Sequence, residues 1–187
     1  RLGPVADRMD AVADVLARAE EADVIVTTGG ASVGDHDLMR PALEAWGATI
    51  DFWRVAMKPG KPLLIARKGE TIVLGLPGNP VSSLICWLLL GRAMIAGLEG
   101  RTPRRGHGFP VPSKSAFDRR SGRTEFVPVK LIDDNGGFGV EILGRGGSAR
   151  LRPLAEADGL AEITAEKGDI RPGDILLFHP LHNGFAV

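Results

Sequence analysis

The chain has 187 residues, of which 44% are hydrophobic and 25% charged, so it can bury one large core or two small ones. Its 23 basic and 23 acidic side chains give a formal charge of zero, which argues against a nucleic-acid binder. The single cysteine excludes an intrachain disulfide and agrees with a reducing compartment.

The first hundred residues predict an α/β layer fold. A helix is expected from about Pro4, then a strand at 24–28 and a helix that ends near Trp46. Strands near 50–56, 63–66 and 71–75 precede a long helix at 80–98. The β-branched run at 24–27 is typical of a strand that is buried on both faces of a parallel sheet.

A glycine-rich loop follows that first strand. Gly29, Gly30 and Gly34 let the backbone approach a ligand closely, and Asp35 and Asp37 supply the hard oxygen ligands that Mg²⁺ prefers. Ligands of open α/β sheets bind beyond the carboxyl ends of strands, where this loop lies. Taken alone, the loop is explained equally well as a turn with an Asp helix cap.

A second loop contains two lysines. Lys58 and Lys61 flank a Pro-Gly pair, and such a turn can aim both ammonium groups into one cleft, which would suit a dianion. The alternative is that both are solvated turn residues, as most lysines in such turns are.

A third loop repeats the pattern of a strand that runs into a Gly/Pro loop and then a helix. Pro80 fits the first helical turn, where Ser82 and Ser83 and the exposed N–H groups can bind an anion. Three strand-end loops therefore predict one site for an oxyanion and a divalent cation.

The second part of the chain reads as a small β-barrel after an Arg/Pro/Gly-rich connection. Short runs near 124–131, 138–143, 161–164 and 174–178 alternate with turns at 134–137 and 171–174. We therefore expect an α/β domain at 1–100, a linker at 101–112 and a barrel domain at 113–187.

The apolar run around Cys86 is expected to be a core helix. It is interrupted at Gly91 and Arg92, so we predict that it is too short to span a bilayer, and Cys86 is expected to be a small core residue. No leader pattern opens the chain, so the predicted location is cytoplasmic, with no membrane and no nucleic-acid partner.

These motifs, together with Gly122-Arg123-Thr124-Glu125-Phe126, resemble the molybdopterin molybdenumtransferases, the MoeA-type family that includes the gephyrin E domain. The resemblance covers most of the chain. It implies a MogA-like, molybdopterin-binding three-layer domain followed by a small all-β barrel domain. The activity it implies is Mg²⁺-dependent insertion of molybdate into adenylylated molybdopterin, with release of AMP, to give the molybdenum cofactor.

The resemblance also implies roles for individual residues. Asp35, Asp37, Lys58 and Lys61 would be catalytic, and the two aspartates would also hold Mg²⁺. Substrate contacts would come from the remaining matched positions: Gly29, Gly30, Ser32, Gly34, Pro62, Gly78, Asn79, Pro80, Ser82, Arg123 and Ser148.

The chain also departs from the family pattern, because it starts with Arg1 and lacks the family's first strand and two further N-terminal domains. We expect it to be the C-terminal part of a larger protein, which leaves open whether this stretch catalyses anything alone. Family members imply a homodimer that contacts the molybdopterin adenylyltransferase and recipient molybdoenzymes. The alternatives are an adenylyltransferase-like or other nucleotide-binding domain, and a gephyrin-like scaffold.

Overall fold

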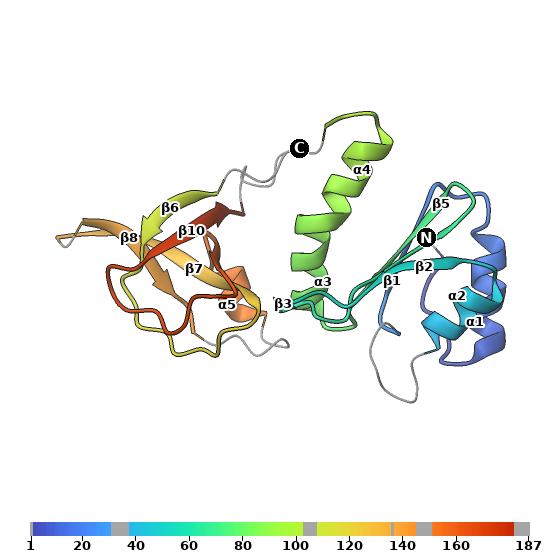
Figure 1. The fold of residues 1–187 in the computed structure, drawn as a ribbon, viewed down its shortest axis with the longest axis horizontal. Helices are drawn as coiled ribbons and strands as arrows, with labels where there is room; N and C mark the ends of the chain where they lie inside the picture. Colours follow the sequence, from blue (N-terminus) through green and yellow to red (C-terminus); the bar gives the residue numbers. More distant parts are fainter. Residues whose placement is uncertain (1, 31–37, 103–107, 136, 145–150, 182–187) are drawn as a thin grey trace. The chain divides into compact units, whose positions relative to one another are not determined.

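The computed structural model describes residues 2–30, 38–102, 108–135, 137–144 and 151–181. The chain divides into two compact units (Figure 1). Unit 1 comprises 1–55 and 60–83, and unit 2 comprises 56–59 and 84–187. The predicted boundary at 101–112 remains a prediction.

Unit 1 is built on a four-stranded mixed sheet with the order β1-β5-β4-β2. Its strands are β1 (Val24–Thr28), β2 (Thr49–Trp53), β4 (Leu64–Lys68) and β5 (Thr71–Leu76). Strands β1 and β5 are parallel, whereas β4 is antiparallel to both β5 and β2. All four strands were predicted from their apolar, β-branched sequences.

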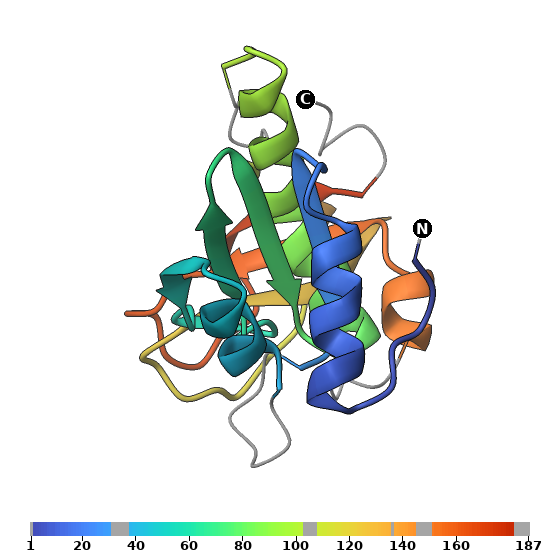
Figure 2. The same ribbon diagram turned by 90° about the vertical axis from the view of Figure 1, so that its right-hand side faces the viewer.

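Helices α1 (Met9–Arg18) and α2 (Met39–Ala45) contact each other in unit 1 (Figure 2). Their buried residues Val12, Leu16, Ala42 and Leu43 join one hydrophobic cluster with residues of the sheet. The first helix begins later than predicted because Arg8, with φ of −139° and ψ of 140°, is extended and the helix starts after it.

Strand β1 differs from the prediction that both its faces are buried. Among the described residues it pairs with β5 and is an edge strand, and Val26 is 44% exposed. The apolar sequence of a strand does not reveal whether it will have neighbours on both sides.

Unit 2 contains a six-stranded sheet with the order β3-β7-β9-β10-β6, in which β8 pairs with β7. The strands are β3 (Met57–Lys58), β6 (Phe109–Pro112), β7 (Thr124–Asp134), β8 (Gly137–Ile142), β9 (Gly159–Ile163) and β10 (Ile175–Pro180). The short helix α5 (Arg152–Ala155) contacts β7. Both predicted turns are confirmed: Asp134 pairs with Gly137, and the Asp174 N–H donates to Arg171 O at 3.0 Å.

The all-β domain is confirmed, but its strands do not close into a barrel among the described residues. Ser113, the residue after β6, forms an isolated bridge with Val140 of β8. Strand β6 contains Pro110 and Pro112, which have no N–H to donate to a second neighbour. The proline residues therefore favour an edge strand at this position.

The helix that starts at Pro80 runs through α3 (Pro80–Cys86), the π-helical turn η1 (Trp87–Gly91) and α4 (Arg92–Leu98). Its 19 residues are long and apolar enough to cross a membrane by length and composition, so the prediction that the run is interrupted and too short is wrong. The same test is passed by core helices of soluble proteins, and Ile85, Cys86 and Ala96 have no exposed surface.

Candidate functional site

Two of the predicted loops lie together in unit 1, because β1 and β5 are adjacent parallel strands that end at the same edge. The Gly29 N–H donates to Leu76 O at 3.0 Å. Gly29 and Gly30 have φ of 87° and 68°, and a Cβ on Gly78 would lie 3.4 Å from Gly29 Cα. Glycine is therefore suited to these positions both by backbone conformation and by the close approach of the two loops.

The start of the helix after β5 is capped by Asn79. Its Oδ1 accepts hydrogen bonds from Val81 N–H at 3.1 Å and Ser82 N–H at 3.2 Å, and its carbonyl accepts from Ser83 N–H at 2.8 Å. Ser82 is only 4% exposed, and its hydroxyl lies 3.5 Å from Asn79 Oδ1. The N–H groups that were expected to be open to an anion are thus already occupied by the Asn79 cap.

Five predicted site residues lie outside the described residues: Ser32, Gly34, Asp35, Asp37 and Ser148. The predicted metal site at the two aspartates therefore stays a prediction. Within the described ranges, no group of three or more His, Cys, Asp or Glu side chains is arranged to hold a metal ion.

The two lysines of the second loop belong to different units. Lys58 is part of unit 2, whereas Lys61 and Pro62 are part of unit 1, where Lys61 O accepts a hydrogen bond from Val55 N–H at 3.1 Å. The convergence of both ammonium groups on one ligand remains a prediction.

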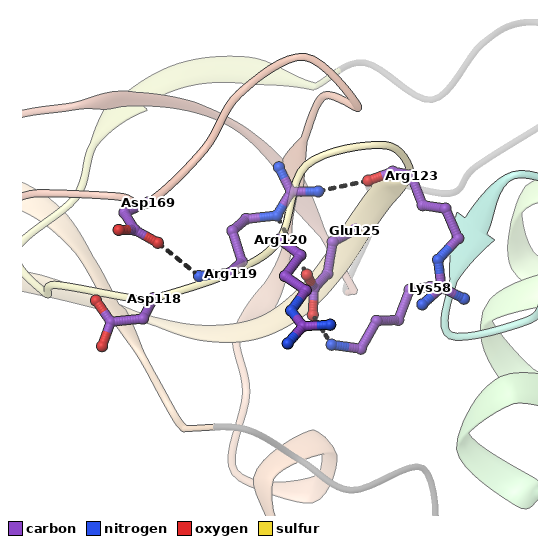
Figure 3. Close-up of a pocket in the computed structure, with 7 residues that line it drawn as sticks. All are labelled: Lys58, Asp118, Arg119, Arg120, Arg123, Glu125 and Asp169. Atoms are coloured by element: carbon purple, nitrogen blue, oxygen red, sulfur yellow. Dashed lines mark hydrogen bonds and ion pairs between the residues drawn. The ribbon is translucent and has the colours of Figure 1, made fainter.

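Lys58 lines a pocket of about 510 Å³ that lies entirely within unit 2 (Figure 3). Strand β3 brings Lys58 beside the first residues of β7, since Met57 pairs with Thr124 and Lys58 with Glu125. The loop before β7 supplies most of the other lining residues. The lining is completed by Asp118, Arg119, Arg120, Arg123 and Asp169.

A buried carboxylate organises this pocket. Glu125 is 5% exposed, and its Oε1 lies 2.7 Å from Lys58 Nζ while its Oε2 accepts from Arg119 Nε at 3.2 Å. Two cations thus share one carboxylate, which satisfies the negative charge that burial would otherwise penalise. Lys58 keeps half of its side-chain surface exposed and is still accessible to a ligand.

Arg120 and Arg123 are the pocket's available anion binders. Neither guanidinium makes a hydrogen bond or an ion pair with another residue in the part of the chain that the structure describes, and both residues are exposed. Asp118 and Asp169 both form ion pairs with Arg171. The lining as a whole has four cations and three carboxylates, so the pocket carries an excess of positive charge. The planar guanidinium groups of Arg120 and Arg123 can donate hydrogen bonds to an anion there.

Sequence reasoning found Lys58 and Arg123 but missed the other five residues that line the pocket, including Asp118 and Asp169. Arg119 and Arg120 were visible only as part of a basic run, and Glu125 was noticed as a motif position without a role. A carboxylate two residues after an arginine at the start of a strand was the available signal for Glu125.

Comparison with known proteins gives two successive matches along the chain. A family model described as "Probable molybdopterin binding domain" matches residues 1–97, and one described as "MoeA C-terminal region (domain IV)" matches residues 110–181. A protein of Haemophilus influenzae named "Molybdopterin molybdenumtransferase" is 29% identical over 170 residues. The chain belongs to the molybdopterin molybdenumtransferase family.

Other members of the molybdopterin molybdenumtransferase family agree with this assignment. "Molybdopterin molybdenumtransferase 2" of Mycobacterium tuberculosis is 32% identical over 166 residues, which are 83% of this chain and 39% of that protein. A crystal structure of a molybdopterin biosynthesis MoeA protein from Pyrococcus horikosii has a TM-score of 0.75 at 26% identity, with 95% of this chain and 42% of that chain covered. The Haemophilus match covers 90% of this chain and 42% of the relative, so the chain spans less than half the length of these relatives.

Proposed function

We propose that the protein to which this chain belongs inserts molybdate into adenylylated molybdopterin and releases AMP, giving the molybdenum cofactor. The observation that supports this proposal is the unit 2 pocket, where Lys58, Arg120 and Arg123 present positive charge around one space. A tetrahedral dianion is well matched by guanidinium and ammonium donors. The names of the family relatives agree with a molybdenum-transferring role.

In this mechanism the chain's residues bind and orient, and contribute no nucleophile. Cleavage of a pyrophosphate-like linkage is accelerated mainly by positioning and by neutralisation of charge. Arg123 and Lys58 would hold the oxyanion near the dithiolene of the substrate. The loops at Gly29 and Gly78 would let the bulky nucleotide approach the backbone.

Mg²⁺ would be held by Asp35 and Asp37, whose carboxylate oxygens are the donor type that this ion takes beside phosphates. When bound, the ion would neutralise charge on the phosphate that leaves with AMP.

Cys86 takes no part in this proposal. The side chain has no exposed surface, and burial raises the pKa of its thiol to about 12. A protonated, buried thiol can neither attack a phosphate nor compete with the dithiolene for the metal.

We propose a cytoplasmic homodimer that contacts the molybdopterin adenylyltransferase and recipient molybdoenzymes. Because the relatives are more than twice as long as the matched stretch, we propose that regions of the full-length protein outside this chain complete the substrate site. A gephyrin-like scaffold is the alternative that relatives also suggest, since a Dictyostelium discoideum protein named "Gephyrin" is 27% identical to the chain.

The test is AMP release from adenylylated molybdopterin by the full-length protein with Mg²⁺, in the presence and absence of molybdate. The proposal predicts release that molybdate stimulates. A folded full-length protein that releases no AMP under either condition would overturn the enzymatic reading and favour the scaffold.

A further inference from the structure

Arg119 is the most completely hydrogen-bonded side chain of the pocket. Its side chain is 2% exposed, and its guanidinium donates to Glu125 Oε2 at 3.2 Å, to Thr164 O at 2.8 Å and to the carbonyl oxygens of Lys167 and Arg123. Four of the five N–H donors of the guanidinium therefore have acceptors. In addition, the Arg119 backbone N–H donates to Asp169 Oδ1 at 2.8 Å.

Two of these acceptors, Glu125 and the Arg123 carbonyl, belong to residues that line the pocket. Glu125, on β7, contacts Lys58 with its other carboxylate oxygen at 2.7 Å. The Arg123 carbonyl belongs to the residue whose side chain lines the pocket. Figure 3 shows the Arg119 guanidinium joined to the main-chain oxygen of Arg123, and Arg119 Nε also donates to Glu125 Oε2. Arg119 thus contacts both the carboxylate that holds Lys58 and the main chain of Arg123.

We propose that Arg119 is a positioning residue for the oxyanion pocket, which fixes Lys58 through Glu125 and Arg123 through its main-chain carbonyl. This inference rests on the proposed function of the pocket. The role requires guanidinium geometry, because one ammonium group has three donors on a single atom and cannot reach acceptors spread over four residues. Charge alone at this position is therefore insufficient.

The first test is Arg119→Lys in the full-length protein, with molybdate as the probe. We expect the molybdate concentration for half-maximal AMP release to rise about tenfold, because charged hydrogen bonds that orient the ligands are lost. The maximal rate should change less. Calorimetric titration of the protein with molybdate alone, without turnover, should show the same loss of affinity.

Two further variants separate positioning from folding. Val140→Ala removes buried surface from the same unit, away from the pocket, and should lower Tm without changing molybdate affinity. Glu125→Gln keeps the side-chain shape but loses the charged contact with Lys58. It should weaken molybdate binding. The double variant with Arg119→Lys should bind molybdate no more weakly than the weaker-binding single variant, because both substitutions disrupt the same Arg119–Glu125–Lys58 contacts.

The outcomes distinguish the two proposals. A wild-type protein that binds no molybdate would overturn the oxyanion pocket itself. A wild type that binds, with folded Arg119→Lys binding equally well, would overturn only the positioning role. Tighter molybdate binding by Glu125→Gln would also overturn it, because Glu125 would then act by repelling the anion.

Discussion

Lys58 and Arg123 reach the same pocket from two elements that lie 65 positions apart in sequence, and they are held differently. Lys58 is held by the buried carboxylate of Glu125, whereas the Arg123 guanidinium makes no hydrogen bond or ion pair with another described residue. The ion pair with Glu125 orients the Lys58 ammonium group, and the exposed half of its side chain leaves that group accessible to a ligand.

Replacement of Lys58 by alanine should weaken molybdate use in the full-length protein. We expect a tenfold or larger rise in half-saturating molybdate, because a charged hydrogen bond to the anion is lost. Unfolding should change little, since Lys58 is half exposed and Glu125 keeps Arg119 as a partner. Steady-state AMP release and thermal unfolding measure the two effects.

Lys130→Ala is the matched control, because Lys130 is an exposed lysine of β7, the strand that pairs with β3, and does not line the pocket. It should leave molybdate dependence unchanged. Equal molybdate dependence of Lys58→Ala and Lys130→Ala would remove Lys58 from the site.

Arg123→Lys tests whether the guanidinium acts through geometry. A planar, bidentate contact with an oxyanion should be lost on replacement by lysine, so molybdate affinity should fall about tenfold although the charge is kept. Titration of the full-length variant with molybdate measures this. Wild-type affinity in the variant would show that Arg123 acts as a point charge.

Sequence reasoning at this scale recovered residues that belong to short motifs and missed those defined by tertiary acceptors. Arg119 could not be recognised, because the carbonyl oxygens that hold it lie 45 and 48 positions along the chain. The same limit applies to Ser82, whose expected free N–H is occupied by the Asn79 side chain.

At the scale of elements, most strands were predictable because their apolar runs end at glycine, proline and asparagine residues. Strand β3 was missed because it has two residues and exists through pairing with β7. The small β-barrel was predicted from short runs that alternate with turns, without the effect of Pro110 and Pro112 on the pairing capacity of β6.

Replacement of Gly91 in the long helix by alanine tests its packing, because the direction of the change in Tm depends on that packing. A Cβ at this position would lie 2.2 Å from Trp87 Cε3, so Gly91→Ala should overpack the π-helical turn by about 1–3 kcal/mol. Alanine's better helix propensity recovers only about 1 kcal/mol. Thermal unfolding should therefore show a lower Tm.

Gly97→Ala is the control in the same helix, at an exposed position, and should leave Tm unchanged or raise it slightly. An increase in Tm for both variants would contradict the close packing of Gly91 against Trp87.

Asp174 provides a pH-dependent prediction at the turn before β10. Hydrogen bonding from the Arg171 N–H, with a further contribution from Lys167, lowers the pKa of this carboxyl below its ordinary value of 3.8. A lowered folded-state pKa means that the ionised form stabilises the fold above that ordinary value, and that the stabilisation is lost as pH falls through the folded pKa.

Asp174→Asn should accordingly lower Tm at neutral pH by a small amount, since the side chain is one-third exposed and solvent screens its interactions. The difference from wild type should shrink as pH falls below 3.8. A difference in Tm that is constant between pH 7 and pH 3 would show that the charge of Asp174 does not contribute.

At the scale of the whole molecule, the chain spans less than half the length of these relatives. Unit 1 holds the glycine loops at Gly29 and Gly78, and unit 2 holds the cationic pocket. The order of these parts in sequence was predictable from motifs. Their placement relative to the rest of the full-length protein depends on contacts that no local pattern encodes.

The most direct test of the central claim is the position of a bound oxyanion in the full-length protein. Crystals soaked with tungstate, which is nearly isosteric with molybdate, can be measured at a tungsten absorption edge to locate the metal. We predict an anomalous peak in the unit 2 pocket, within contact distance of Lys58 and Arg123. A peak elsewhere, or no peak at a concentration that saturates molybdate-stimulated AMP release, would contradict the account.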